Sequence, residues 1–230
     1  MSDPTRIAIV GATGLIGRAI IDQSVGREDV RILAIGRREM KLPRGCRMEM
    51  VVADPGDWGT VFERTRPDVV VSALGTTWNK AGKNEEAFRA VDQALVLNTA
   101  KAAHQHGVKR IIAVSSIGAD VAAKNFYLRV KGEVERGLLK IGFDRVDILR
   151  PGLLRGRRQS DRRAGERIGI AISPIADLLM HGKYRKYRSI SDADVAQAVL
   201  TLAMRRAAGK FVHEHDALKL AAGHLPRLQG

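Results

Sequence analysis

Cysteine is almost absent from the sequence: Cys46 is the only one among 230 residues. A single cysteine excludes an internal disulfide and a metal cluster held by several thiolates. The N-terminus enters an apolar segment at once, without the basic region and long apolar run of a signal peptide. We therefore expect a reducing compartment and predict a cytoplasmic protein.

Long apolar runs and aromatic side chains are also scarce. No stretch approaches the ~18 continuous apolar residues of a membrane-spanning helix, so we predict no membrane span. Aromatic residues make up 4% of the chain, and no helix-turn-helix, zinc-finger or aromatic stacking pattern is present. These absences argue against nucleic acid as a partner. No set of side chains has metal-ligand spacing, so no metal site is predicted.

Positive charge is in excess, with 39 Lys and Arg against 25 Asp and Glu and a net charge of +14. The segment 155–163 alone holds five Arg and one Asp, and 182–188 holds four cations. This charge suits nucleic acid, an anionic membrane surface, or an acidic cofactor or small-molecule substrate. A solvated basic surface is the alternative. A protein partner or a homo-oligomer is a separate expectation that the charge does not decide.

The first two thirds of the sequence alternate between short β-rich runs and helical patterns. The predicted strands cover 6–10, 30–35, 47–52, 68–74, 110–116 and 145–150. The predicted helices between them cover 15–25, 57–66, 85–106 and 124–140. Apolar strands that alternate with helices predict an α/β fold, a doubly wound parallel sheet covered on both faces.

After Arg150 the pattern changes to a basic loop and a small helical elaboration. Short helices are expected near 164–181, a helix over 191–206 with Ser191 as N-cap, and then a short strand and a last helix. We expect one domain over 1–230, with a core at 5–152, a C-terminal substrate-covering portion at 153–222 and a frayed tail at 223–230.

The segment "GATGLIG", Gly11 to Gly17, follows the first predicted strand and opens the first helix. Its three glycines permit a tight turn, close approach of the backbone to a phosphate, and close helix–strand packing. Free N–H groups at the helix start attract a pyrophosphate. We predict a Rossmann-type dinucleotide site, rather than a packing loop without ligand, with contacts from Gly11, Thr13, Gly14, Leu15, Ile16 and Gly17.

The ends of later strands extend this predicted cofactor site. Arg37 and Arg38 follow the second strand and suit the 2′-phosphate of NADP(H), unless they are merely solvated. Asp54 follows the third strand and either accepts a hydrogen bond from the adenine amine or caps the next helix. Leu74 and Gly75 follow the fourth strand, where glycine lets the backbone pass close to the cofactor.

A further pattern, Tyr127-x-x-x-Lys131, lies in "FYLRVKGEVE". The spacing places phenol and ammonium one turn apart on the same helix face. Alone it fits either a catalytic pair or an ordinary amphipathic helix.

Together these segments resemble the atypical short-chain dehydrogenase/reductase (SDR) superfamily, and more narrowly its Tat-interacting-protein-like branch of NAD(P)-binding oxidoreductase-like proteins. The matching segments occur in family order over nearly the whole chain: "GATGLIG", "GRR", "LGTTWNKAG", "FRAVD", "VSSIGAD", "FYLRVKGEVE", "ILRPGLL" and "GKY…DVAQAVLTLA". The resemblance implies a Rossmann fold that binds NADPH, and this branch includes members discussed as regulatory binding proteins.

The resemblance also implies roles for individual residues. Tyr127 would be the proton donor and acceptor, and Lys131 would stabilise the phenolate and hold the nicotinamide ribose. Ser116, with Ser115 as the alternative, would hydrogen-bond the substrate oxygen. The backbone of Pro151 and Gly152 would lie beside the nicotinamide.

The chain departs from the family pattern at Asp92, where many relatives carry an Asn in a proton relay. The Ser116-to-Tyr127 separation is also shorter than in most extended SDRs. Trp78 could stack on the substrate or anchor its loop to the core.

The leading functional hypothesis is an NADPH-dependent reductase of a small carbonyl or enone-like substrate, with Tyr127 as proton donor. The substrate would be anionic if the basic loop at 155–163 forms its lid; that loop could instead bind a protein partner. The alternative function is an NADP(H)-binding regulatory or scaffold protein without robust turnover.

Overall fold

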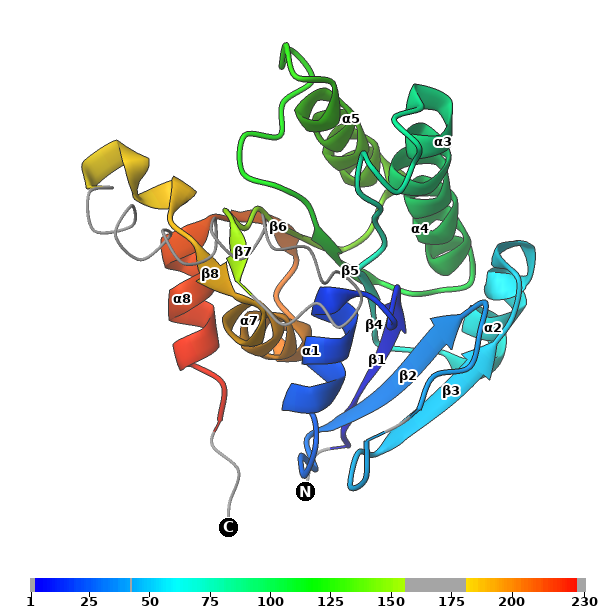
Figure 1. Ribbon diagram of the computed structural model, residues 1–230. Helices are drawn as coiled ribbons and strands as arrows, with labels where there is room; N and C mark the ends of the chain where they lie inside the picture. Colours follow the sequence, from blue (N-terminus) through cyan, green and yellow to red (C-terminus); the bar gives the residue numbers. More distant parts are fainter. Residues whose placement is uncertain (1–2, 42, 156–180, 227–230) are drawn as a thin grey trace.

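The computed structural model describes residues 3–41, 43–155 and 181–226 (Figure 1). Its central element is a parallel sheet of seven strands in the order β3-β2-β1-β4-β5-β6-β9. The strands are β1 (Thr5–Val10), β2 (Val30–Gly36), β3 (Met48–Val52), β4 (Val69–Ser72), β5 (Arg110–Val114), β6 (Arg145–Leu149) and β9 (Gly209–His213). The predicted doubly wound parallel sheet is confirmed, and the short strand predicted near the C-terminus is its seventh member.

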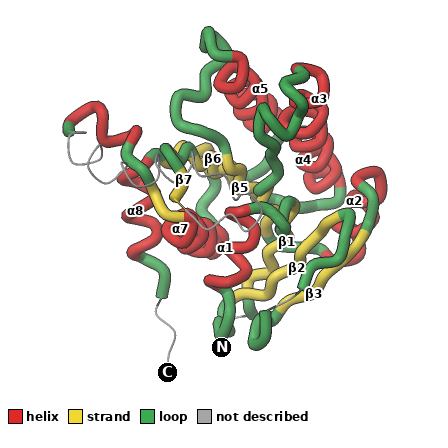
Figure 2. The backbone as a smooth tube through the Cα atoms, viewed as in Figure 1, coloured by secondary structure: helices red, strands yellow, loops and turns green. Residues whose placement is uncertain are grey.

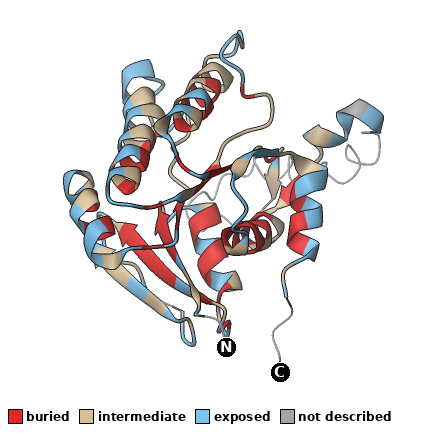
Figure 3. Ribbon diagram, turned by 180° about the vertical axis from the view of Figure 1, so that it is seen from behind, coloured by how far each residue is buried: buried red, intermediate tan, exposed pale blue. Residues whose placement is uncertain are grey.

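Helices cover both faces of the sheet (Figure 2). On one face pack α1 (Leu15–Gln23), α7 (Asp192–Met204) and α8 (His215–Gly223). On the other pack α2 (Trp58–Thr65), α4 (Val96–Gln105) and α5 (Phe126–Ile141). Because helices cover both faces, β4 and β6 are buried along their whole length (Figure 3).

The helix predicted over 85–106 is three successive pieces. These are α3 (Glu85–Arg89), a π-helical turn η2 (Ala90–Leu95) and α4. The hydrophobic repeat predicted the overall helix but not the wider π turn inside it. The helices predicted near 164–181 lie outside the described residues.

Shorter elements complete the described part of the chain. Two 3₁₀ helices, η1 (Pro55–Asp57) and η3 (Gly182–Tyr187), precede α2 and β8 respectively. A separate two-stranded parallel ladder joins β7 (Leu154–Arg155) to β8 (Ile190–Ser191). No helix in the described part of the chain is long and apolar enough to cross a membrane.

Side-chain caps fix where two of the important helices begin. The Asn125 side chain accepts a hydrogen bond from the Leu128 N–H at the start of α5. Ser191 accepts one from the Asp194 N–H at the start of α7, as predicted. Because all seven strands are parallel, their carboxyl ends meet at one edge, and the strand order reverses between β1 and β4. This is the place where open α/β sheets bind ligands.

Candidate functional site

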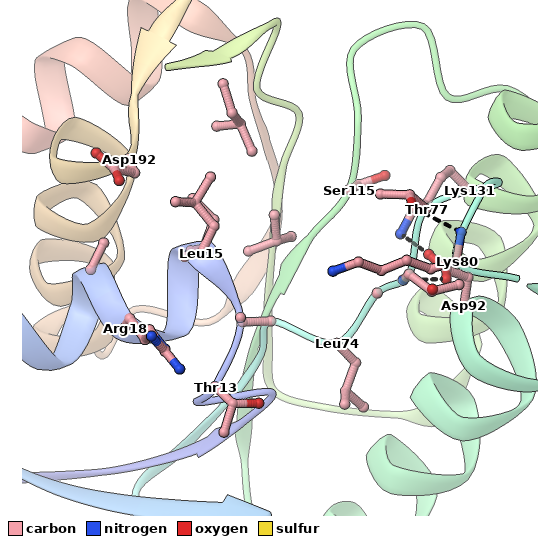
Figure 4. A pocket seen from close by; sticks show the side chains of 18 of the residues that line it. Thr13, Leu15, Arg18, Leu74, Thr77, Lys80, Asp92, Ser115, Lys131 and Asp192 are labelled. Atoms are coloured by element: carbon pink, nitrogen blue, oxygen red, sulfur yellow. Dashed lines mark hydrogen bonds and ion pairs between the residues drawn. The ribbon is translucent and has the colours of Figure 1, made fainter. Parts of the chain in front are cut away.

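A cavity of ≈ 1060 Å³ opens at this reversal of strand order (Figure 4). One wall comes from the glycine loop, defined as Gly11 to Gly17, and from α1. The other comes from the segment after β4, the end of β5 and helix α5. Its lining includes Thr13, Gly14, Leu15, Ile16, Arg18, Leu74, Gly75, Thr76, Thr77, Lys80, Asp92, Ser115, Tyr127, Lys131, Leu154 and Asp192.

The glycine loop is built by contact between backbone atoms. Gly11 has φ +87°, and a Cβ there would lie 2.5 Å from the carbonyl oxygen of Ala73. A Cβ on Gly17 would lie 2.3 Å from the carbonyl oxygen of Gly11. Gly11 therefore lets the loop pack against the residue that follows β4, and Gly17 lets α1 pack against the loop, while residues 13–16 line the cavity.

The start of α1 faces the cavity without a side-chain cap. Its N-cap is Gly14, and no side chain accepts a hydrogen bond there. The first-turn N–H groups of Leu15, Ile16 and Gly17 have no acceptor within the helix. A Cβ on Gly14 would lie 3.2 Å from the Gly11 carbonyl oxygen, so a larger residue at this position would crowd the turn. The arrangement fits a pyrophosphate.

On the opposite wall, one face of α5 carries the residues of the tyrosine–lysine pattern. Tyr127 and Lys131 both line the cavity, and the Lys131 ammonium lies 5.8 Å from the centroid of the Tyr127 ring. Glu135 follows one turn later on the same face, which we call the α5 face: Tyr127, Lys131 and Glu135.

Lys131 forms an ion pair with a buried carboxylate. Its Nζ lies 2.8 Å from Asp92 Oδ1, and the side chains are 8% and 1% exposed. The other carboxylate oxygen, Oδ2, accepts a hydrogen bond from the Thr76 N–H at 2.7 Å. Gly75 lies against this pair, since a Cβ there would be 3.4 Å from Asp92 Oδ1. Asp92 thus links Lys131 to the segment after β4.

The π turn η2 accounts for the position of Asp92. π-helical turns are rare and occur often at functional sites. Here the turn joins α3 to α4 and includes Asp92, which is buried between α5 and Thr76. The sequence identified Asp92 as a departure from the family pattern, but not the turn that contains it.

Glu135 is the centre of a second cluster of hydrogen bonds on the α5 face. The Ser115 hydroxyl donates a hydrogen bond of 2.5 Å to Glu135 Oε1. The Arg150 guanidinium donates to the same carboxylate from Nε at 3.0 Å, and this hydrogen bond raises the pKa of Arg150. Ser115 lines the cavity, whereas Ser116 does not, and the Ser116 hydroxyl lies 3.4 Å from the Ile117 carbonyl oxygen.

Several predicted cofactor contacts lie outside the cavity lining. Arg37, Arg38 and Asp54 are exposed at the ends of β2 and β3, and Asp54 makes no side-chain cap with η1. Pro151 is buried after β6, and a Cβ on Gly152 would lie 2.4 Å from the Arg188 carbonyl. The predicted Leu74 and Gly75 do line the cavity.

The sequence interpretation did not identify Arg18, Thr76, Thr77, Lys80 or Asp192 as lining residues. Lys80 belongs to "LGTTWNKAG", so the motif itself offered a signal. Trp78, in the same motif, packs its ring 5.4 Å from Phe126, measured between centroids, and is absent from the lining. Its geometry supports the anchoring alternative.

Within the described ranges, no group of His, Cys, Asp and Glu could hold a metal ion.

Among proteins of known sequence, the chain is similar to fungal proteins named FMP52, mitochondrial. It is 37% identical to the Emericella nidulans protein over 165 residues, which are 69% of this chain and 70% of the relative. It is 32% identical to the Saccharomyces cerevisiae protein over 160 residues, 68% and 69% of the two chains. These names contradict the predicted cytoplasmic localisation. A single cysteine indicates a reducing environment, which is not unique to the cytoplasm.

Among solved structures, the fold is similar to that of a Bacillus halodurans protein provisionally assigned as an NAD-dependent epimerase/dehydratase. That pair has a TM-score of 0.68 and 23% identity, with 96% of this chain and 100% of that chain covered. The Bordetella bronchiseptica enzyme WbmG in complex with NAD gives a TM-score of 0.66 at 18% identity, covering 97% and 79%.

A sequence model of a protein family described as NAD(P)H-binding matches residues 11–206. The match starts at the first glycine of the loop and extends through the α5 face and the whole of α7. The narrower resemblance to the Tat-interacting-protein-like branch stays a prediction. The glycine loop, the parallel sheet and this match together show that the chain belongs to the NAD(P)H-binding family, with a fold of the atypical SDR type.

Proposed function

We propose that the protein is an NADPH-dependent reductase of the atypical SDR type, acting on a small carbonyl-type substrate. One observation carries the proposal: the uncapped start of α1 and the Tyr127–Lys131 pair line the same cavity. A nucleotide whose pyrophosphate binds at α1 can extend toward Tyr127 within that cavity. The names of the curated relatives favour a mitochondrial setting for this activity.

NADPH, when bound, supplies a hydride to the substrate carbon. Tyr127 donates the proton that the substrate oxygen then requires. Lys131 stabilises the resulting phenolate and holds ribose hydroxyls, while Asp92 holds the Lys131 ammonium beside the cavity. Ser115 is the serine that lines the cavity, and its bond to Glu135 orients its hydroxyl.

The preference for NADPH over NADH rests on Arg37 and Arg38. Both are exposed at the carboxyl end of β2 and therefore accessible to a 2′-phosphate. We would titrate the protein with NADPH and NADH by fluorescence, comparing wild type with Arg37→Ala. NADPH binding should weaken by at least about tenfold, because hydrogen bonds to charged groups are strong, while NADH binding stays the same.

The matched control is Arg31→Ala, which removes an exposed arginine from the opposite end of the same strand. It should leave both affinities unchanged. Equal binding of the two nucleotides to wild type would overturn the NADPH assignment.

The reductase activity is tested with Tyr127→Phe, which removes only the phenolic hydroxyl. NADPH oxidation in a panel of small aldehydes, ketones and enones should fall by at least about a hundredfold, with NADPH affinity retained. Retained turnover in the variant would exclude Tyr127 as the proton donor.

A second function is supported by the serine geometry. The Ser115 hydroxyl already donates to Glu135, and Ser116 is outside the cavity lining. An NADP(H)-binding regulatory protein needs neither serine at a substrate. For this function we expect tight NADPH binding, no turnover in the carbonyl panel, and no effect of Tyr127→Phe.

A further inference from the structure

The loop of residues 76–84, between β4 and α3, is held firmly at both ends. Trp78 packs its ring edge-on against Phe88, with the two centroids 6.2 Å apart, and the Lys83 N–H donates to the Trp78 carbonyl at 3.0 Å. Asn84 caps α3 by accepting a hydrogen bond from the Ala87 N–H at 2.8 Å. The loop is thus anchored on the aromatic cluster beside Tyr127.

This anchoring directs Lys80 into the cavity. The Lys80 backbone N–H donates to Thr77 Oγ1 at 3.2 Å, which fixes the start of the side chain. Figure 4 shows the Lys80 side chain reaching from the loop into the space between the two walls. Among the described residues, its ammonium makes no hydrogen bond or ion pair.

The other cations of the lining already have partners. Lys131 is paired with Asp92, and Arg18 also has an interaction partner. The phosphates of a dinucleotide would bind at the uncapped start of α1, on the wall opposite Lys80. The Lys80 ammonium therefore remains for another anion.

The charges of the cavity also indicate where that anion would lie. Within the described part of the chain, three carboxylates line the cavity: Asp22 in α1, Asp192 in α7, and Asp92, which is paired with Lys131. An anionic substrate group is repelled by Asp22 in the last turn of α1 and by Asp192, and is attracted to Lys80, which lies on the wall that carries Lys131. Apolar surface for the remainder of the ligand comes from Leu15 and Leu154.

We propose that Lys80 determines substrate specificity by binding an oxyanion, a carboxylate or phosphate, near the reacting end of a partly apolar substrate. This inference rests on the proposed reductase function and extends it to a substrate class. Lys80 is a binding residue here and takes no part in proton or hydride transfer.

The test measures binding of three probes of similar shape: benzoate, phenyl phosphate and the neutral benzamide. Ligand-detected NMR titrations would use wild type, Lys80→Met and Lys83→Met, each with saturating NADP⁺ and without nucleotide. Lys83→Met removes the same charge from the same loop at an exposed position outside the lining.

Wild type and Lys83→Met should bind at least one anionic probe about tenfold tighter than benzamide, and Lys80→Met should lose this preference. The preference should also shrink as salt is raised, because screening weakens accessible charge pairs. A preference for benzoate alone would identify a carboxylate, and one for phenyl phosphate alone a phosphate. The proposal would be overturned if neither anionic probe binds, if wild type does not prefer an anionic probe to benzamide, or if the preference persists in Lys80→Met.

NADPH titrations of the same three proteins separate this proposal from the proposed function. The Lys80→Met variant should bind NADPH with unchanged affinity. A tenfold loss of NADPH affinity would assign Lys80 to the cofactor, overturning the substrate proposal while the reductase proposal stands. If wild type fails to bind NADPH, the reductase proposal fails, and the titrations without nucleotide still decide whether Lys80 binds an oxyanion.

Discussion

The two walls of the cavity are stabilised by different kinds of interaction. The wall formed by the glycine loop is made of backbone atoms so close that Gly11 and Gly17 have no room for a Cβ. The wall formed by the α5 face is made of buried charges: Lys131 pairs with Asp92, and Glu135 binds Ser115 and Arg150. The first wall depends on shape and the second on charge.

This difference matches the chemistry expected of each wall. A phosphate group is bound by backbone N–H donors that carry no full charge, so the glycine wall needs only close packing. Proton transfer requires side chains whose charges are fixed in position, so the α5 face holds its ammonium with a buried carboxylate. Changes in charge should therefore damage one wall, and changes in volume the other.

The largest effect is expected from Asp92→Ala. The substitution leaves the buried Lys131 ammonium without its carboxylate and removes the acceptor of the Thr76 N–H. Loss of one partner of a buried pair costs about 4 kcal/mol in the free energy of unfolding. Urea denaturation measures this loss of free energy. The double variant Asp92→Leu with Lys131→Met should be less destabilised than Asp92→Ala. If the double variant loses as much free energy of unfolding or more, packing is more important than charge at this position.

A smaller loss, about 3 kcal/mol, is expected from Gly17→Ala in the glycine wall, because the new Cβ meets fixed backbone at 2.3 Å. NADPH binding should be lost together with thermal stability. The control Gly56→Ala adds a methyl group where nothing lies within 4 Å and should leave the melting temperature unchanged. A stable Gly17→Ala protein with normal NADPH affinity would show that the loop can widen.

The two walls also differ in how well the sequence predicted them. The glycine loop was predicted because its requirement is local: three glycines, placed between a strand and a helix, describe the turn completely. The strands and the Ser191 cap were predicted for the same reason. Tyr127 and Lys131 share a helix face, which the spacing alone establishes.

Contacts between distant segments could not be predicted in this way. Glu135 lies 20 residues from Ser115, and only the packing of α5 beside β5 brings them together. The choice between Ser115 and Ser116 depends on that contact. Lys80 points into the cavity because Trp78 is fixed on Phe126, the first residue of α5. Hydrophobic periodicity carries no information about such pairs.

The shape-dependent wall also has a polar contact at its edge, which Ser191→Ala tests. α7 packs against α1, and Ser191 Oγ accepts the Asp194 N–H at 3.0 Å. Removing this cap should lower the free energy of unfolding by about 1 kcal/mol. Thermal denaturation measures the loss, and Ser191→Asn, which can still cap, should recover most of it. NADPH affinity should not change, since Ser191 is absent from the lining.

The smallest effect is expected from a partly exposed ion pair that joins α3 to α5, where Arg89 Nη1 lies 2.6 Å from Glu133 Oε2. The hydrogen bond from Arg89 lowers the pKa of Glu133. An acid whose pKa is lower in the folded state stabilises the fold above its unfolded pKa of about 4.3, and this contribution disappears as pH falls through the folded pKa. Because the pair is partly solvated, Glu133→Gln should cost only about 0.5 kcal/mol at pH 7.

Melting temperatures of wild type and Glu133→Gln should therefore differ slightly at neutral pH and converge as pH falls below about 4. Glu63→Gln is a suitable control, because Glu63 is 66% exposed and its carboxylate lies 3.9 Å from His106 Nδ1. If Glu133→Gln lowered the free energy of unfolding as much as Asp92→Ala, burial would not distinguish the two ion pairs. The expected contrast would show that α5 is stabilised by charge mainly on the face that lines the cavity, where the Lys131 ammonium is needed.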